Sequence, residues 1–331
     1  MPDPRRLRVG LAQIAAVVLD RGATMNKVVA RVEEAAREGC GLVVFGETVL
    51  PGYPAWIART DGARFDAADQ KALHAAYLRA AVQPEAGDLA DLCACAARHR
   101  IAVMIGVAER AADRGGHSLY CSRVFITADG AIASTHRKLM PTYEERLSWS
   151  IGDGAGLVVH PVGPFRVGGL NCYENWMPLA RVALQGQGED LHVALWPGAE
   201  RLTGEITRFL AREARSYVIS ISGLMRADDF PATFPHRERL QLKDGEVLFD
   251  GGSAVAGPDG DWVVPPVCGR ETLIVVDLDH DRVLEERQNF DPAGHYARPD
   301  VLRLVVDRTR QSGVELSGES GPGRPVGDPL R

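Results

Sequence analysis

The sequence lacks the long apolar segments and the basic blocks that mark membrane proteins and nucleic-acid-binding proteins. No apolar run approaches the ~20 residues that a membrane-spanning helix requires. Residues 1–6 lead into a predicted strand and not into the apolar core of a signal peptide, so we expect a cytoplasmic protein. Lysine and arginine are dispersed and the net charge is −6, which does not favour binding to nucleic acid or to an anionic membrane.

The six cysteines show no spacing typical of a metal site, and the motifs of two large enzyme classes are missing. Cys93 and Cys95 form a C-x-C inside an alanine-rich stretch, with no second pair at zinc spacing. No G-x-S-x-G of a serine hydrolase occurs, and the glycines of residues 152–156 lack both G-x-G-x-x-G spacing and a Walker lysine. We therefore expect no metal and no organic cofactor, and we interpret five of the six cysteines as buried free thiols.

What the sequence does contain is the alternation of strands and helices of an α/β protein. Its 331 residues, of which 45% are hydrophobic, are enough to bury a substantial core. A strand over residues 7–14, a helix with Thr24 as its predicted cap and a strand ending at Glu47 form a β-α-β unit, which favours a site at the strand ends. Asp129-Gly130 predicts a tight hairpin, so antiparallel pairing joins the sheet. Further helices are predicted over residues 66–83, 86–100, 177–185, 203–216 and 279–288, and further strands over 101–108, 119–127, 131–136, 191–196, 218–224, 252–256, 262–264 and 272–278.

Two stretches differ in composition from this alternation. Residues 226–250 are polar and contain two prolines, so we expect a long surface excursion there. Residues 312–331 hold five glycines and three prolines with little apolar content, which predicts a disordered tail. The predicted folded domain therefore covers residues 1–311.

Cys172 lies where a short apolar strand, residues 165–170, gives way to a helix opened by Pro178. The free N–H groups at the start of a helix lower the cost of a nearby negative charge, which favours a thiolate. A lone cysteine after an apolar strand is nevertheless most often a small buried hydrophobe. Assigning Cys172 to catalysis thus depends on the rest of the chain.

Two other segments place an ionisable side chain at the end of a predicted strand. Glu47 ends the apolar run of residues 42–45 and is followed by Pro51-Gly52. Lys138 follows a strand, and Pro141 ends regular structure just after it. Taken singly, the glutamate is equally compatible with capping a loop and the lysine with a solvated basic cluster.

Together the three segments resemble the signature regions of the nitrilase, or carbon–nitrogen hydrolase, superfamily, whose catalytic residues are Glu, Lys and Cys in this chain order. The resemblance runs from about residue 7 to about residue 304 and is greatest to the nitrilase branch, because of residues 172–181, the Glu145-Arg146 pair and residues 295–301. It implies a four-layer α-β-β-α sandwich with mixed sheets. The matching motifs are Phe45-Gly46-Glu47 with Pro51-Gly52-Tyr53-Pro54, His136-Arg137-Lys138-Leu139-Met140-Pro141-Thr142 and Asn171-Cys172-Tyr173-Glu174-Asn175.

The resemblance also implies the chemistry. Cys172 would attack the carbon of an organic nitrile, Glu47 would act as the base, and Lys138 would stabilise the developing charge, giving a carboxylic acid and ammonia. Glu145 fits a second glutamate that the family places near the cysteine, and we expect it to position the substrate or the attacking water. The residues expected to bind substrate are Tyr53, Thr142, Trp149, Tyr173 and Trp176.

One residue departs from the family pattern, and two alternatives stay open. The family usually has tryptophan after the cysteine, whereas this chain has Tyr173, which keeps the backbone N–H but changes the shape of the pocket. The same triad would serve an amidase or a carbamoylase acting on a C–N single bond. A homologue that kept the fold without turnover is the non-enzyme alternative. The family also implies self-association, from dimers to spirals.

Overall fold

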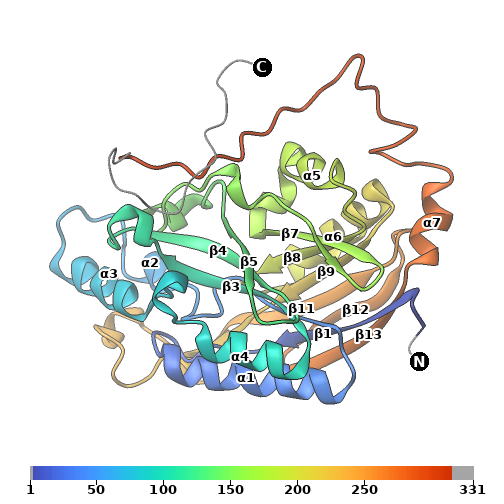
Figure 1. The fold of residues 1–331 in the computed structure, drawn as a ribbon. Coiled ribbons are helices and arrows are strands. Elements are labelled where there is room, and N and C mark those ends of the chain that lie inside the picture. Colours follow the sequence, from blue (N-terminus) through green and yellow to red (C-terminus); the bar gives the residue numbers. More distant parts are fainter. Residues whose placement is uncertain (1–2, 315–331) are drawn as a thin grey trace.

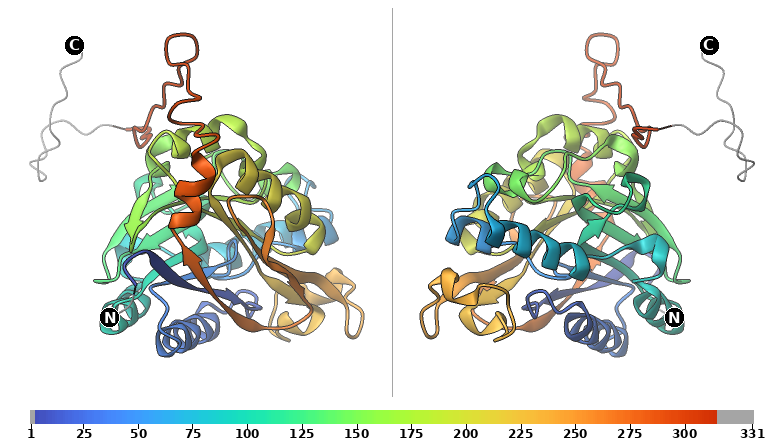
Figure 2. Two further views of the ribbon diagram at one scale, coloured as in Figure 1. Left: turned by 90° about the vertical axis from the view of Figure 1, so that its right-hand side faces the viewer. Right: turned by 90° about the vertical axis from the view of Figure 1, so that its left-hand side faces the viewer.

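The computed structural model describes residues 3–314 and contains two mixed β-sheets packed face to face, with helices on both outer faces (Figures 1 and 2). Helices α1 (Arg21–Arg37) and α4 (Ala90–His99) cover the first sheet, and helices α5 (Pro178–Gln185) and α6 (Glu200–Ala214) cover the second. The predicted four-layer α-β-β-α sandwich is thereby confirmed. Among residues 3–314, no helix combines the length and the apolar character needed to cross a membrane.

The first sheet contains the two strands that end just before Glu47 and Lys138. Its order is β13-β1-β2-β3-β4-β5, with β1, β2 and β3 parallel and the other three strands antiparallel to their neighbours. The β4–β5 hairpin turns at Asp129-Gly130, as predicted, and Gly130 has the positive φ of 86° that such a turn requires. The strands are β1 (Arg6–Gln13), β2 (Leu42–Phe45), β3 (Ala102–Arg110), β4 (Leu119–Ile126), β5 (Ile132–Arg137) and β13 (Thr272–Asp279).

The second sheet carries Cys172. Its order is β10-β11-β9-β8-β7-β6, with β12 paired to β11, and its central strands β7, β8 and β9 are parallel. Helix α7 (Asp281–Arg287) follows the last strand of the first sheet. The strands are β6 (His160–Val162), β7 (Phe165–Asn171), β8 (Leu191–Trp196), β9 (Tyr217–Ser222), β10 (Leu224–Arg226), β11 (Val247–Ala256) and β12 (Trp262–Cys268).

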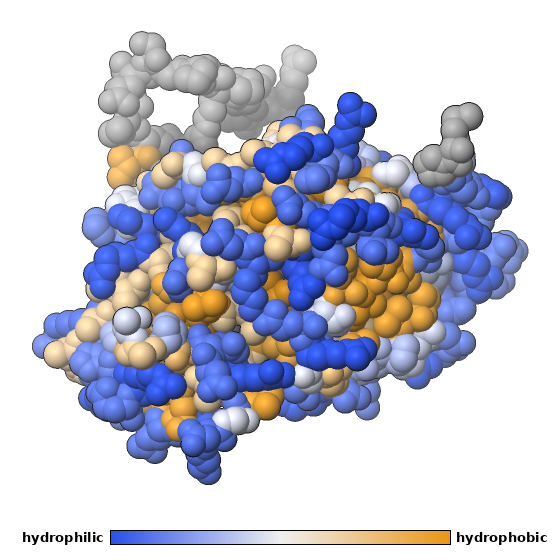
Figure 3. All heavy atoms as spheres, turned by 90° about the horizontal axis from the view of Figure 1, so that it is seen from below, coloured by the Kyte–Doolittle hydropathy of each residue, from blue (hydrophilic) through white to orange (hydrophobic). Residues whose placement is uncertain are grey.

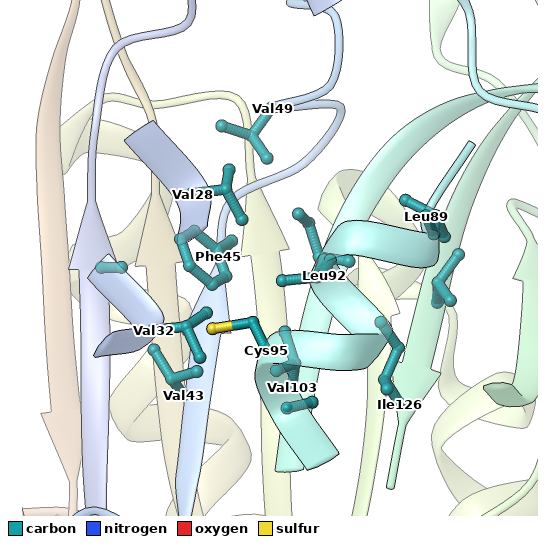
Figure 4. Packing of buried hydrophobic residues seen from close by; sticks show 14 of the residues in the cluster. Val28, Val32, Val43, Phe45, Val49, Leu89, Leu92, Cys95, Val103 and Ile126 are labelled. Carbon is teal, nitrogen blue, oxygen red and sulfur yellow. The ribbon is translucent and has the colours of Figure 1, made fainter. Parts of the chain in front are cut away.

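Apolar side chains fill the spaces between these layers. Figure 4 shows the space between the first sheet and its helices, where Val32 from α1 and Leu92 from α4 meet Phe45 from β2. A second cluster lies between the two sheets and includes Val44 from β2 and Val193 from β8. Seen from below, where α1 lies, the outer surface is mainly hydrophilic with apolar residues showing between the charged ones (Figure 3). Helices α1 and α4 therefore bury one face and leave the other in water.

Helix α1 begins differently from the prediction. Asp20 is its N-cap, and the carboxylate accepts a hydrogen bond from the Ala23 N–H at 2.9 Å. Thr24, the predicted cap, lies buried within the first turn, where its hydroxyl oxygen accepts from the Val17 N–H at 3.0 Å. Aspartate and threonine are both good N-caps, and the aspartate four residues earlier takes the position.

Residues 226–250 form the predicted surface excursion, but it is anchored at several points. Phe230, Phe234 and Leu240 are buried, and the Phe234 ring lies 5.7 Å from that of Trp56. Trp56 begins the short helix α2 (Trp56–Arg59), which precedes α3 (Ala68–Ala80). Most of the segment is exposed or half-buried, as predicted, but a few apolar side chains anchor it on a distant part of the chain.

The end of the chain runs as an extended segment from α7 past α5 (Figure 1). Arg310 fastens this segment to the body, since it pairs with Asp153 at 3.0 Å and donates to the Thr135 carbonyl at 2.8 Å. Of the disordered tail predicted over residues 312–331, residues 315–331 lie outside the described part of the chain.

Candidate active site

Three strand ends from the two sheets converge on one pocket. Glu47 follows β2, Lys138 follows β5, and Cys172 begins a single 3-10 turn (Cys172–Trp176) directly after β7. The Glu47 N–H donates to the Trp196 carbonyl at the end of β8 at 3.1 Å, which ties the first sheet to the second at this point. The backbone at Glu47 passes close to Gly106 of β3. A Cβ atom at position 106 would stand 2.6 Å from the Glu47 Cα, so glycine is needed there. The sequence segments that resemble the family motifs are thus neighbours in space.

Lys138 lies between two buried carboxylates. Its Nζ donates to Glu47 Oε1 at 2.8 Å and to Glu145 Oε2 at 2.7 Å, and all three side chains are at most 3% exposed. One carboxylate oxygen from each glutamate and the Cys172 sulfur all lie within 4.8 Å of one another. An acid, an amine and a thiol are therefore within reach of a single substrate carbon.

The two oxygens of Glu47 have different surroundings. Oε1 accepts from Lys138 and, at 3.2 Å, from the thiol of Cys121 on β4. Oε2 is buried and has no hydrogen-bond partner among residues 3–314. Burial, opposed by the charge of Lys138, raises the pKa of Glu47 from 4.5 to about 7. A carboxylate with one unpaired oxygen and a pKa near neutrality is suited to accept a proton at physiological pH.

Burial and charge act in opposite directions on Cys172 and Lys138. Burial raises the pKa of the Cys172 thiol well above its usual value, although the nearby ammonium of Lys138 lowers it. Burial alone would lower the pKa of Lys138, but the negative charges of Glu47 and Cys172 outweigh it and raise that pKa well above 10.5. At neutral pH the lysine is therefore charged and the resting cysteine is a thiol, which has to lose its proton to a base before it can attack.

The backbone at Cys172 is held in an uncommon conformation. Cys172 has φ 47°, in the left-handed region, and Thr48 and Tyr143 in the two glutamate segments share this feature with φ 46° each. The Asn175 side chain donates to the Cys172 carbonyl at 2.7 Å. Glu174 accepts from the Asn171 N–H at 2.9 Å through one oxygen, so the turn is closed by its own side chains.

A buried glutamate also couples the turn at Cys172 to the lysine segment. Glu174 Oε1 accepts from the Leu139 N–H at 2.7 Å and lies 3.0 Å from His136 Nε2. Burial would raise the pKa of Glu174, but the charge and hydrogen bond of His136 outweigh it and lower that pKa. The ionised carboxylate therefore fixes the separation of Lys138 and Cys172.

Glu145 has less freedom than Glu47. Its Oε1 accepts from the Tyr53 hydroxyl at 2.9 Å, while Oε2 accepts from Lys138 and from the Thr142 N–H at 2.6 Å. Both oxygens are thus engaged by donors. This arrangement suits a residue that orients Lys138 and bound substrate better than one that shuttles protons.

The pocket in front of these groups has a volume of about 450 Å³. Of the residues expected to bind substrate, Tyr53, Thr142 and Tyr173 line it. Trp149 does not, because it stands behind Tyr53 with the ring centroids 5.6 Å apart. Trp176 is 50% exposed and lies outside the pocket. The apolar part of the wall includes Leu202, Val247, Leu248 and Phe249, and Arg59, Glu144 and Arg201 add charged groups to the lining.

Neither these apolar lining residues nor Cys121 was expected at the site from the sequence. Val247, Leu248 and Phe249 belong to the end of the segment expected to be a surface excursion and the start of β11. The apolar run of these three residues was the available signal that a strand begins there. For Cys121, alternation within the strand predicts burial, but nothing in the sequence indicates that it faces Glu47.

Two groups of side chains in the described residues bring three possible metal ligands within 4.8 Å of one another. In the group of Glu47, Glu145 and Cys172, the Lys138 ammonium already donates to both carboxylates. The other group is Glu33, Cys95 and His99, between α1 and α4, where Arg98 pairs with Glu33 at 3.7 Å. A cationic side chain accompanies each group, which is unfavourable for binding a second cation.

Comparisons with known proteins agree with this geometry. Residues 8–288 match the model of the family described as carbon-nitrogen hydrolase. The chain is 35% identical over 318 residues to an aliphatic nitrilase of Sinorhizobium fredii (strain HH103), covering 93% of this chain and 98% of that protein. It is 36% identical over 308 residues to nitrilase 2 of an unknown prokaryotic organism, with 92% and 94% covered.

Solved structures share the fold. A CN-hydrolase superfamily protein from Xanthomonas campestris superposes with a TM-score of 0.67 at 18% identity, covering 91% of this chain and 99% of that one. An amidase from Nesterenkonia sp. gives a TM-score of 0.61 at 19% identity, with 87% and 95% covered.

Proposed function

This chain belongs to the carbon–nitrogen hydrolase family, and we propose that within it the protein is a nitrilase, which converts an organic nitrile to a carboxylic acid and ammonia. The observation that carries the proposal is the Lys138 ammonium between Glu47 and Glu145, with the Cys172 sulfur within 4.8 Å of both carboxylates. Relatives of 35% and 36% identity that are named nitrilases support the choice of substrate class.

In the first step of the proposed mechanism, the unpaired Oε2 of Glu47 takes the proton of the Cys172 thiol. The thiolate adds to the nitrile carbon, forming a C–S bond, and the nitrogen takes the proton back from Glu47 to give a thioimidate. Lys138 stays protonated because of the carboxylates around it, so its charge stabilises the negative charge that develops.

Two waters complete the reaction. Glu47, ionised again, removes a proton from the first water, which adds to the thioimidate carbon and gives a tetrahedral species. Proton transfer to nitrogen then releases ammonia and leaves an acyl thioester. A second water, activated in the same way, cleaves the C–S bond, releases the carboxylic acid and returns the proton to Cys172. The Tyr173 N–H, which faces the sulfur, is placed to donate to the oxyanion.

The pocket supports a substrate with an apolar organic group. Its lining includes the side chains of Leu202, Val247, Leu248 and Phe249, which can contact an apolar group without losing hydrogen bonds to water, while Arg59 and Arg201 add positive charge. Tyr173, about half exposed, stands beside Cys172 at the edge of the pocket. We propose that these residues select the nitrile.

An amidase is the second candidate, because structural neighbours of the same fold are amidases and the same residues can attack an amide carbonyl.

The test that distinguishes a nitrilase from an amidase is the release of ammonia from aliphatic, aromatic and arylacetic nitriles and from their cognate amides. We expect at least one nitrile to yield acid and ammonia. The rate should fall as the pH drops below about 7, because protonation of Glu47 removes the base. Ammonia from amides alone would favour the amidase.

We further propose that the protein self-associates in the cytoplasm. The six cysteines are all free, which suits a reducing compartment. Leu179 and Val182 on α5 and Phe209 on α6 are exposed apolar residues, and Arg181 holds the two helices together through its ion pair with Glu213 at 2.9 Å. Such a patch is typical of a surface that a second copy covers.

Charge introduced into this patch should disrupt the assembly. We expect Leu179→Glu to lower the molar mass measured by light scattering after size-exclusion chromatography, because it buries a carboxylate against apolar residues. Leu284→Glu is the matched control, since Leu284 is similarly exposed, at 59%, on α7. An unchanged mass for Leu179→Glu, or equal loss in both variants, would contradict the assignment of the patch.

A further inference from the structure

Cys121 is the residue of β4 that contacts both Glu47 and Lys138. Its thiol lies 3.2 Å from Glu47 Oε1, and its backbone carbonyl accepts from the Lys138 N–H at 2.8 Å. The side chain is 1% exposed, so water does not compete for the thiol proton. One position of the sheet is thus linked to the proposed base and to the lysine.

The thiol contact divides the two oxygens of Glu47 into different roles. Oε1 receives both donors, Lys138 at 2.8 Å and Cys121 at 3.2 Å, whereas Oε2 receives none among the described residues. A carboxylate that could rotate freely would exchange its oxygens. Two donors on the same oxygen oppose this rotation and leave the other oxygen for the reacting atoms.

We propose that Cys121 is a positioning residue, whose thiol holds Glu47 Oε1 so that Oε2 faces Cys172 and the substrate. A thiol is a weak donor, so it orients the carboxylate while stabilising its charge less than a hydroxyl would. Glu47 keeps its basicity as a result. This inference rests on the proposed function, in which Glu47 is the base.

The other buried cysteines outside the pocket show that the contact is particular to this position. Cys40 and Cys95 lie in the apolar cluster next to α1 and α4, and neither thiol has a hydrogen-bond partner among residues 3–314. They behave as small hydrophobes. Cys121 differs because its thiol donates a hydrogen bond to a carboxylate.

The groups that face Glu47 come from several segments. Burial raises the pKa of Glu47 and Lys138 lowers it, while Glu145 raises it and the Cys121 thiol lowers it. Tyr53, Tyr77 and Cys172 are further ionisable neighbours of Glu47. Substitutions at position 121 change one donor and leave the other groups in place.

Two substitutions at this position should shift the pH dependence in opposite directions. In Cys121→Ser, a hydroxyl donates more strongly and favours ionised Glu47, so the acidic limb of kcat/KM should move to lower pH by roughly half to one unit. In Cys121→Ala the donor is lost, so the limb should move to higher pH. The plateau of kcat/KM should also fall roughly tenfold or more in Cys121→Ala, because Glu47 loses its orientation, and recover largely in Cys121→Ser.

The controls separate positioning from packing and from the proposed function. Cys95→Ser makes the same chemical change in a buried cysteine remote from the pocket and should keep the wild-type profile. The pH dependence of Cys172 alkylation by iodoacetamide, followed on the Cys172 peptide by mass spectrometry, needs no substrate and should show the same two shifts. Hydrolysis of no nitrile or amide would contradict the function but leave this measurement valid. Unshifted profiles, or shifts of the same sign in both variants, would overturn the role of Cys121.

Discussion

Cys172→Ala is expected to abolish hydrolysis of every substrate, with a loss of about 10⁶-fold in kcat, the size seen when a covalent nucleophile is removed from an enzyme that depends on it. The reason is that Glu47 and Lys138 act on bonds that the sulfur forms. Without the C–S bond, the base has only a water to activate, and a water is less nucleophilic than a thiolate. The loss should appear in kcat for nitriles and amides alike.

Mass spectrometry of the protein mixed with substrate and quenched with acid provides the measurement. The wild type should carry the mass of a thioimidate or an acyl group on the Cys172 peptide, and Cys172→Ala should carry none. Cys40→Ala is the matched control, because Cys40 is also buried but lies far from the pocket. Turnover by Cys172→Ala within about a hundredfold of the wild type would refute covalent catalysis through this residue.

Lys138→Met is expected to reduce both activity and stability. Removing the ammonium leaves the buried carboxylates of Glu47 and Glu145 facing each other without compensation, which typically costs about 3–5 kcal/mol of unfolding free energy. The charge that develops during catalysis also loses its stabilising partner, so ammonia release should fall by at least 10²–10³-fold. Urea unfolding and ammonia assays measure the two effects.

The destabilisation should depend on pH in a defined direction. Burial already raises the pKa of Glu47 from 4.5 to about 7, and losing Lys138 removes a group that lowers it. Because the folded variant binds the proton more tightly than the folded wild type, its deficit relative to the wild type is complete above the variant's raised pKa and shrinks as the pH falls toward about 7. Lys71→Met is the control: that lysine is exposed and pairs with Asp66 at the surface, so the change should stay below about 1 kcal/mol at any pH. A deficit independent of pH would show that lost packing, and not charge, is responsible.

The strand ends that carry the proposed catalytic residues could be predicted from the sequence because each is marked locally. An apolar run stops at Glu47, a proline follows Lys138 by three residues, and Cys172 stands between a strand and a helix opened by Pro178. The meeting of these three ends was expected only through the resemblance to a family. No local pattern shows that strands more than 30 residues apart point to the same pocket.

The walls of the pocket could not be predicted, for a related reason. The ring centroids of Phe249 and Tyr53 lie 5.4 Å apart, yet nearly 200 residues separate the two in the sequence and the stretch just before Phe249, residues 226–246, is largely polar. Trp149 and Trp176 look alike in the sequence, each in a motif loop. One is buried behind Tyr53 and the other is half exposed, because the first loop folds back over the first sheet and the second lies on the outer surface. Such differences depend on tertiary packing, which the identity of a residue does not report.

The left-handed backbone at Thr48, Tyr143 and Cys172 implies that stability and catalytic activity favour different residues at such positions. An L-residue with a side chain loses about 1–2 kcal/mol in this conformation, a penalty that glycine avoids. Glycine at position 172 would therefore suit the fold better than cysteine while removing the sulfur. Cysteine at this position thus serves the proposed reaction at the expense of stability, as is common where an active site holds a strained backbone.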